Sequence, residues 1–205
     1  MISPFQNNDT IVAVATAPGV GAIAVIRLSG PEAISITNTV FKGKDLTKQA
    51  SHTIHFGTIR DEDKIIDEVL VSLFVAPHSY TKENVVEISC HGSDYIVQQI
   101  VKLLLKHGAR LANAGEFTKR AFLNGQFDLA QAEAVADLIS SDSALSHEVA
   151  MKQMRGGFSQ EIKRLRAELV HFASMIELEL DFGEEDVEFA DREQLRTLIL
   201  NIQRI

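Results

Sequence analysis

The sequence predicts an α+β protein in two parts, a mixed strand-and-helix part over residues 1–115 and an all-helical part over residues 116–205. Before residue 115, short runs rich in β-branched residues alternate with stretches of helical periodicity. After residue 115, apolar residues recur almost only at spacings of three and four, as in amphipathic helices. The chain is 45% hydrophobic and 23% charged, which is ordinary for a globular protein and leaves ample material for a core.

Strands are predicted for five apolar runs of the first part, because these runs are rich in β-branched residues and are bounded by turn-forming residues. They are residues 10–16, 22–28, 52–60, 65–75 and 85–90. A short polar turn over residues 61–64 separates the third run from the fourth. These two runs are therefore predicted to pair as an antiparallel hairpin.

Helices are predicted for five segments with helical spacing of apolar residues. They are residues 31–41, 93–107, 128–140, 144–180 and 193–205. Ser93 and Asp128 stand where an N-cap is expected, since short polar side chains can accept the free amides of the first turn. Gly156 and Gly157 interrupt the fourth segment, which predicts a break or a close helix crossing there.

The glycine-rich stretch "ATAPGVGAIAVIRLSG" over residues 15–30 invites comparison with a nucleotide-binding loop. A P-loop ends in Gly-Lys-Ser/Thr, and a dinucleotide-binding loop leads straight into a helix. Here neither follows, because the next residues are the alternating, β-branched run "AIAVIRL". The glycines are therefore predicted to connect two strands.

Charge and cysteine content exclude several classes of protein. The formal net charge is −8, which argues against a protein whose main task is to coat nucleic acid. This charge does not exclude a local basic patch on the surface. The only cysteine, Cys90, leaves no partner for an intramolecular disulfide and fits a reducing compartment. No run approaches the length of a membrane span, and the start "MISPFQNNDT" lacks the features of a signal peptide. A cytoplasmic protein without a membrane partner is expected.

Two charged residues interrupt predicted strands and are candidate ligand contacts. Arg27 ends the run "AIAVIR", and Glu87 interrupts "VVEI". Arg27 is either a solvent-facing residue at the end of its strand or a grip for an anion or carboxylate. Glu87 is either an outward residue of a half-solvated sheet or a carboxylate aimed at a flat heterocycle. A pterin or guanine edge would offer it adjacent N–H and NH₂ donors.

Two further stretches carry chemistry-bearing side chains. Cys90 and His91 are neighbours, but adjacent strand residues point to opposite faces, so a buried structural cysteine is favoured over a nucleophile. No cluster has zinc-ligand spacing. In residues 113–139, Glu116, Lys119 and Arg120 crowd with two phenylalanines before a turn. This corner is either a packing corner with a solvated charged side or the wall of a ligand cleft. The acidic run near residue 183 is expected to be a solvated loop.

The motifs "DTIVAVATAPGVGAIAVIRLSG", "SYTKENVVEISCHG" and "AGEFTKRAFLNGQFDLAQAEAVADLI" resemble the MnmE (TrmE) family of tRNA modification GTPases. These blocks lie between residues 9 and 139, and "DFGEEDVEF" resembles the acidic helical-domain segment of the family. The resemblance therefore spans nearly the whole chain. The third block is highly specific for the family, whereas the glycine turn alone would not be specific for it.

The resemblance implies an α+β tetrahydrofolate-binding and dimerising domain, related to the folate-binding part of the glycine-cleavage T-protein, followed by a helical domain. A Ras-like GTPase domain is inserted into that helical domain. With an FAD-dependent partner subunit, MnmG (GidA), the family modifies C5 of the wobble uridine in certain tRNAs. The implied cofactor is 5-formyltetrahydrofolate or another tetrahydrofolate one-carbon derivative, and no catalytic or metal-binding residue is assigned to this chain.

Residue by residue, the folate contacts of the family carry over to Arg27 and Glu87. The third contact falls at Gln126, where this sequence has "FLNGQ" in place of the family's "FLNGK". Any contact made by the ammonium group of that lysine is therefore lost at Gln126.

The sequence also departs from the family by lacking a P-loop, an Asn-Lys-x-Asp guanine motif and the C-terminal Cys-x-Gly-Lys motif. GTP, magnesium and potassium are therefore expected to belong to a GTPase domain outside this chain. The chain is expected to be a fragment that neither binds nor hydrolyses GTP alone. A free-standing folate-binding or aminomethyl-transfer protein of the T-protein type is the alternative, and a scaffold domain with an empty cleft is a third option.

Overall fold

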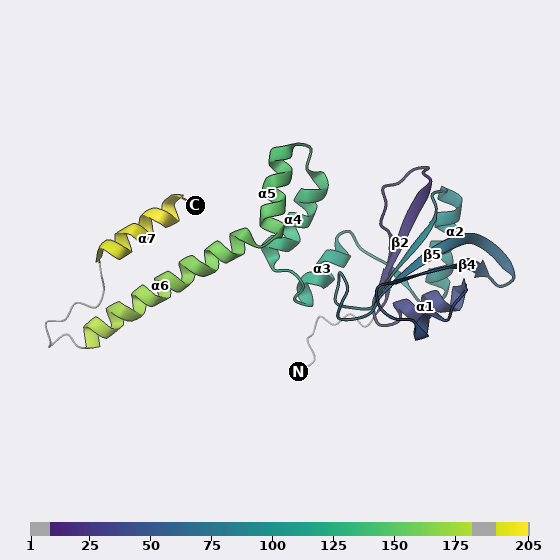
Figure 1. Ribbon diagram of the computed structural model, residues 1–205, viewed down its shortest axis with the longest axis horizontal. Helices are drawn as coiled ribbons and strands as arrows, with labels where there is room; N and C mark the ends of the chain where they lie inside the picture. Colours follow the sequence, from purple (N-terminus) through teal and green to yellow (C-terminus); the bar gives the residue numbers. More distant parts are fainter. Residues whose placement is uncertain (1–8, 182–191, 205) are drawn as a thin grey trace. The chain divides into compact units, whose positions relative to one another are not determined.

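The computed structural model describes residues 9–181 and 192–204 and confirms the predicted α+β class (Figure 1). By contacts the chain divides into two compact units, Met1–Phe127 and Asp128–Ile205. The predicted boundary at residue 115 concerns the functional domains and stays a prediction. Most of the N-terminal decapeptide, the acidic run near residue 183 and the final isoleucine lie outside the described residues.

The first unit is built on a seven-stranded sheet with the strand order β3-β4-β5-β6-β2-β1-β7. The strands are β1 (Ile11–Val14), β2 (Ile23–Ser29), β3 (Phe41–Lys42), β4 (Thr53–Asp61), β5 (Lys64–Phe74), β6 (Val85–His91) and β7 (Arg110–Leu111). All neighbours are antiparallel except β1 and β7, which are parallel. The five predicted strands are the five long ones, and the glycine turn connects β1 to β2 as predicted.

The helices of the first unit are α1 (Ala33–Val40), the short 3₁₀ helix η1 (Leu46–Lys48), α2 (Asp94–Lys106) and α3 (Glu116–Leu123). α1 and α2 pack on one face of the sheet. On the other face, here called the open face, α3 reaches Arg27 through Phe117. In β2, Ala24, Ile26 and Leu28 are buried in one core together with residues of α1 and α2. Because side chains alternate along a strand, Val25 and Arg27 point to the open face. Ser93 precedes α2, but its side chain makes no capping hydrogen bond.

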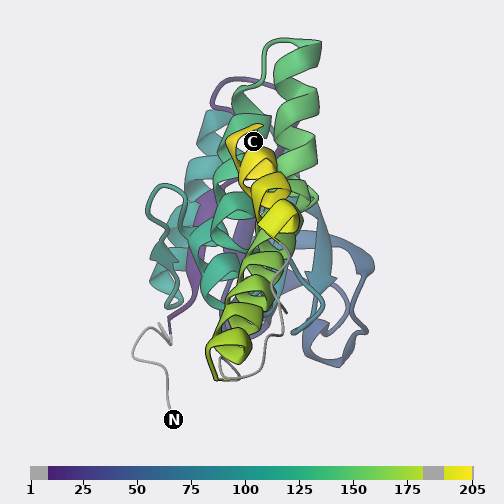
Figure 2. The same cartoon turned by 90° about the vertical axis from the view of Figure 1, so that its left-hand side faces the viewer.

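The second unit consists of helices in its described part. They are α4 (Leu129–Ser140), α5 (Ala144–Met154), α6 (Gly157–Asp181) and α7 (Arg192–Arg204). α4 and α5 lie side by side as a helical hairpin (Figures 1 and 2). The predicted interruption separates α5 from α6, and Gly156 has φ of 79° there, a conformation that glycine adopts without steric cost. Asp128 caps α4 through a capping box with Gln131.

Candidate functional site

Arg27 and Glu87 face each other across two adjacent strands on the open face of the sheet. They are directly opposite in the register of β2 and β6. Nε of Arg27 donates to Oε1 of Glu87 at 2.8 Å, and Nη2 lies 2.6 Å from the same oxygen. Their side chains are 29% and 26% exposed, so the pair is half-buried and still open to a ligand. Both contacts use Oε1, which leaves Oε2 of Glu87 for another donor.

Two aromatic rings flank the guanidinium group of Arg27. Its central carbon lies 5.4 Å from the ring centroid of Tyr80 and 5.8 Å from that of Phe117, both within the range of a cation–π interaction. The hydroxyl of Tyr80 shares a hydrogen bond of 2.9 Å with that of Thr118. The loop after β5 and helix α3 therefore meet beside the Arg27–Glu87 pair. Tyr80 lies within the motif "SYTKENVVEISCHG", but no pattern marked it as a neighbour of Arg27, because its position depends on the path of a loop.

A buried cluster of charges holds α3 in place. Arg120 is 5% exposed and Glu116 is 7% exposed, and Nη2 of Arg120 lies 3.1 Å from Oε1 of Glu116. Arg120 also lies 2.6 Å from Asp9 and 3.3 Å from Glu83, while Arg110 lies 2.6 Å from both Asp9 and Glu116. Glu116 and Arg120 of this corner are thus buried and paired, whereas Lys119 is exposed to solvent.

The ion pairs of this cluster shift the ionisation of its members. Hydrogen bonds from Arg110, with smaller help from the Asn113 amide and Arg120, lower the pKa of Glu116 to about 2 against the opposing effect of burial. Burial opposes ionisation of Asp9 as well, yet hydrogen bonds from Arg110 and Arg120 keep the pKa of Asp9 below its usual value. Glu116 and Asp9 therefore stay ionised at neutral pH, and their pairing with the two arginines fixes the start of α3, which carries Phe117.

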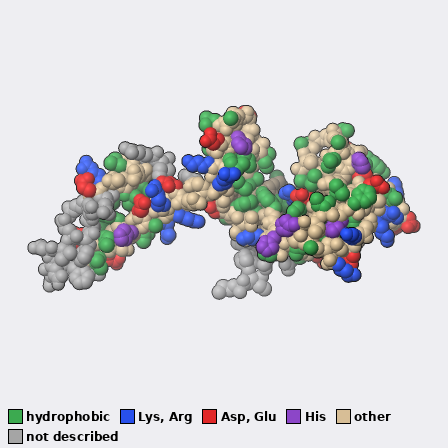
Figure 3. All heavy atoms as spheres, in the orientation of Figure 1, with side chains coloured by type: hydrophobic (Ala, Val, Ile, Leu, Met, Phe, Trp, Pro, Cys, Tyr) green, Lys and Arg blue, Asp and Glu red, His purple; other side chains and the backbone are tan. Residues whose placement is uncertain are grey.

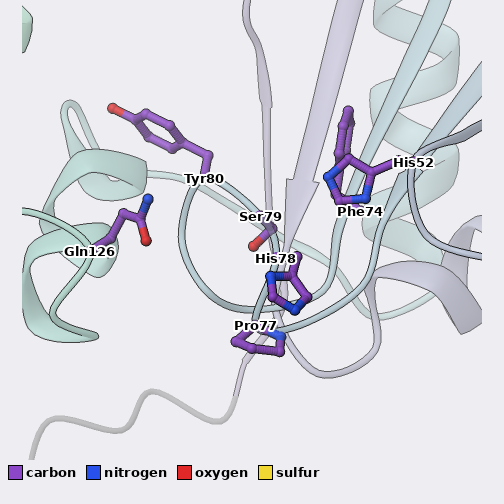
Figure 4. A pocket seen from close by; sticks show the side chains of 7 residues that line it. All are labelled: His52, Phe74, Pro77, His78, Ser79, Tyr80 and Gln126. Carbon is purple, nitrogen blue, oxygen red and sulfur yellow. The ribbon is translucent and has the colours of Figure 1, made fainter.

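Gln126 lies in a different part of the same unit, at a cavity of about 420 Å³. The residues that line this cavity are His52, Phe74, Pro77, His78, Ser79, Tyr80 and Gln126. Tyr80 and Gln126 lie on one side of the cavity, and the rings of His52 and Phe74, which pack edge-to-face, lie on the other (Figure 4). Two of the three predicted site residues, Arg27 and Glu87, therefore contact each other. The third, Gln126, lies apart from them, and Tyr80 lies between the two places, because it lines the cavity and also contacts Arg27.

Cys90 has no features of a nucleophile. It is buried in the core, and its thiol points at the carbonyl oxygen of Ala24 at 3.6 Å. Burial, reinforced by the charge of Asp67, raises the pKa of the thiol to about 11. A thiol that stays protonated at neutral pH is a poor nucleophile. His91 is instead paired with Asp67, with 2.7 Å between Nδ1 and Oδ1.

Comparison with known proteins assigns both units of the chain. The sequence model described as "GTP-binding protein TrmE N-terminus" matches residues 10–126, and the model described as "MnmE helical domain" matches residues 129–205. These matches, together with the α+β fold, define an N-terminal TrmE domain followed by an MnmE helical domain. The chain belongs to the MnmE (TrmE) family, as the motifs predicted.

Similar proteins from several bacteria carry the name tRNA modification GTPase MnmE. The protein of Cytophaga hutchinsonii is 65% identical over 200 residues, which cover 98% of this chain and 44% of the relative. The protein of Flavobacterium johnsoniae is 66% identical over 200 residues, covering 96% of this chain and 43% of the relative. The protein of Bacteroides thetaiotaomicron is 61% identical over 204 residues, which cover 98% of this chain and 44% of the relative. The chain therefore spans less than half the length of these curated relatives.

No helix within residues 9–181 and 192–204 is both long enough and apolar enough to cross a bilayer.

Proposed function

We propose that this chain is the folate-binding, dimerising front half of a cytoplasmic tRNA modification GTPase. With the FAD-dependent subunit MnmG, the whole protein would modify C5 of the wobble uridine in certain tRNAs, using a tetrahydrofolate one-carbon donor. GTP hydrolysis, with its magnesium and potassium, would belong to a domain outside this chain. The observation that carries the folate proposal is the half-buried Arg27–Glu87 pair on the open face of the sheet.

The chemistry of this pair suits the edge of a pterin. A carboxylate accepts hydrogen bonds on both oxygens, each of which has two acceptor sites. Since Arg27 engages only Oε1, Glu87 keeps enough capacity to accept an N–H and an NH₂ group side by side. Arg27 balances the negative charge of the Glu87 carboxylate, and the rings of Tyr80 and Phe117 limit the movement of the Arg27 guanidinium group. When bound, the folate supplies the one-carbon unit, and these residues only bind and orient it.

Exposed apolar side chains on the same open face support a two-fold dimer. Ile23, Ile54 and Phe56 are each about two-thirds exposed, at 66%, 67% and 66%, and Phe56 lies opposite Leu70 in the register of β4 and β5. Hydrophobic side chains also gather at the surface of the first unit in the view of Figure 3. Apolar surface of this kind marks interaction sites, and an isologous contact is the commonest way to cover it.

Calorimetry with 5-formyltetrahydrofolate tests the folate proposal. Glu87→Gln keeps the shape of the side chain but replaces an acceptor oxygen with a donor, so one pterin donor would face another donor. Loss of a charge-assisted hydrogen bond costs roughly 1.5–3 kcal/mol, which is about a ten- to hundredfold rise in Kd. We expect Arg27→Ala to weaken binding by a similar factor.

Two further variants make this experiment decisive. Gln126→Lys restores the cation of the family and should tighten binding, by at most about fivefold because exposed charge pairs contribute about 1 kcal/mol or less. His107→Gln, at the end of α2, is the matched control and should bind like the parent. The site assignment is wrong if Glu87→Gln and Arg27→Ala both keep the parent Kd while retaining its circular dichroism.

A further inference from the structure

Basic side chains are concentrated where helix α5 meets helix α6 in the second unit. Residues 151–170 contain five Lys and Arg residues against two Glu residues, although the whole chain has a formal net charge of −8. In the view of Figure 3, Lys and Arg side chains gather at the end of α5 and along the first half of α6. This stretch therefore forms a positive surface on an acidic chain, and such a surface attracts anions.

Four of these five basic side chains are exposed and make no ion pair within residues 9–181 and 192–204. They are Lys152, Arg155, Lys163 and Arg166, here called the basic patch. The fifth, Arg164, contacts Glu161 and lies 4.0 Å from Glu168. Both acidic residues of this stretch are therefore engaged by Arg164, which leaves the charge of the basic patch available to a partner.

The basic patch extends from the end of α5 along the first part of α6. Lys152 and Arg155 are three positions apart, as are Lys163 and Arg166, and side chains at this spacing are neighbours on a helix surface. The stem of Lys152 lies against the first residue of α6, since a Cβ atom at Gly157 would be 3.1 Å from Cγ of Lys152 and 3.7 Å from its Cε. From Gly157 to Arg166 the helix rises about 14 Å, a length comparable with about four steps of a nucleic acid strand.

Helix stability accounts for only half of the basic patch. Cations at a helix C-terminus stabilise the helix through its dipole, which applies to Lys152 and Arg155 at the end of α5. The second pair of cations lies inside α6, where like charges at neighbouring surface positions repel each other. A hydrogen bond from Ser159 and the charge of Lys163 lower the pKa of Asp128, but the carboxylate of Asp128 caps α4. The second pair therefore has no role in holding α6 together, which favours a role in binding.

We infer that the basic patch binds the phosphate backbone of the RNA substrate. The inference rests on the proposed tRNA-modifying function, and it adds the surface by which this chain holds the RNA. Lys and Arg side chains donate hydrogen bonds to phosphate oxygens, and these contacts position a nucleic acid without reading its sequence. An RNA is the occupant that the charges favour, because a strand carries a phosphate at every step and can neutralise both pairs of cations at once.

Fluorescence anisotropy of a labelled tRNA transcript, titrated with the whole chain, tests this inference. With about four phosphate contacts, the logarithm of the association constant should fall with the logarithm of the salt concentration with a slope of about −3. Lys163→Gln/Arg166→Gln should raise the Kd about tenfold at low salt and should make the slope shallower by about 2. Glutamine is chosen because it removes the charge and remains a good helix former.

Two further double variants control for net charge and for folding. Lys42→Gln/Lys44→Gln removes two exposed cations of the first unit, changes the net charge by the same amount, and should keep the parent Kd. Lys152→Gln/Arg155→Gln removes the other half of the basic patch and should weaken binding like the α6 variant. Circular dichroism of each variant should match that of the parent. The salt dependence of the parent needs no variant at all.

The possible results separate this inference from the folate proposal. Equal weakening in the control and in the α6 variant overturns the basic patch, because net charge alone would then explain binding. A parent that does not bind the tRNA at about 50 mM salt, or whose Kd does not change with salt, also overturns it and points to an acidic protein surface instead. These results leave the folate proposal standing, since calorimetry tests that proposal through Arg27 and Glu87. A parent that binds tRNA through the basic patch but binds no folate rejects the folate proposal alone.

Discussion

Glu116 is a carboxylate kept ionised inside the first unit by two arginines. Its folded pKa of about 2 lies below the ordinary value of 4.5. A carboxyl group whose pKa is lowered by folding stabilises the protein above its unfolded pKa, and this stabilisation is lost as the pH falls toward the folded pKa. For Glu116 the loss therefore falls between about pH 5 and pH 2 and is on the order of 3 kcal/mol.

The pH dependence can be measured on the whole chain with a fluorescence signal that comes from the first unit. Both tyrosines of the sequence, Tyr80 and Tyr95, lie in that unit, and the chain has no tryptophan. Urea unfolding followed by tyrosine fluorescence should show the free energy of unfolding falling steeply below pH 5. Glu116→Gln should be less stable than the parent at pH 7 and show a shallower decline. Glu148→Gln, on the exposed surface of α5, should follow the parent, and an equally steep decline in Glu116→Gln would contradict the assignment.

At the scale of elements, α4 depends on its first residue. The carboxylate of Asp128 accepts the backbone N–H of Gln131 at 2.9 Å, and the side chain of Gln131 accepts the N–H of Asp128 at 3.0 Å. A capping box of this kind satisfies two amides that the helix leaves free. Asp128→Ala removes the acceptor and should destabilise the second unit by about 1 kcal/mol.

Thermal unfolding monitored by far-UV circular dichroism measures this loss. Asp128→Asn is the matched control, because asparagine caps helices about as well as aspartate. We expect Asn to keep the parent melting temperature and Ala to lower it. If both variants have the same melting temperature as the parent, the capping box contributes nothing measurable to the stability of α4.

For the whole molecule, the open sheet face predicts self-association. Sedimentation at micromolar concentration should give about twice the monomer mass of 22.6 kDa. Phe56→Asp places a charge on an exposed position of the apolar face, where it need not disturb the fold, and should shift the equilibrium to monomer. Ile139→Asp, which is on α4 and is 83% exposed in the parent, should leave the dimer intact. A parent chain that is monomeric throughout would remove the basis for this interface.

GTP should have no effect on the stability of this chain. The sequence contains no Gly-Lys-Ser/Thr loop and no Asn-Lys-x-Asp motif, which supply phosphate, magnesium and guanine contacts. A ligand that binds only the native state at a hundred times its Kd stabilises it by about 2.7 kcal/mol. Melting curves with and without GTP and magnesium should therefore coincide. A clear rise with GTP would mean that the chain holds a nucleotide site of another kind.

Much of the fold was predictable because the relevant signals are local. Alternation of β-branched residues marked β2 and β6, helical spacing marked α2 and α4, and two glycines marked the end of α5. Each signal depends on the conformation of a few consecutive residues. Two-residue strands such as β3 and β7 carry no such pattern, since they are strands only through their neighbours. The family motifs also pointed to Arg27, Glu87 and Gln126, whose role in folate binding stays a prediction.

Only the tertiary structure decided which of these residues meet. Arg27 and Glu87 are 60 positions apart, and their pairing depends on the register of β2 against β6, which a shift of one residue would abolish. The partner of Arg120 at Asp9 is 111 positions away, so the burial of this cluster had no local signal. Periodicity determined the elements of this protein, whereas long-range packing determined its sites, because contacts between distant segments depend on the whole fold.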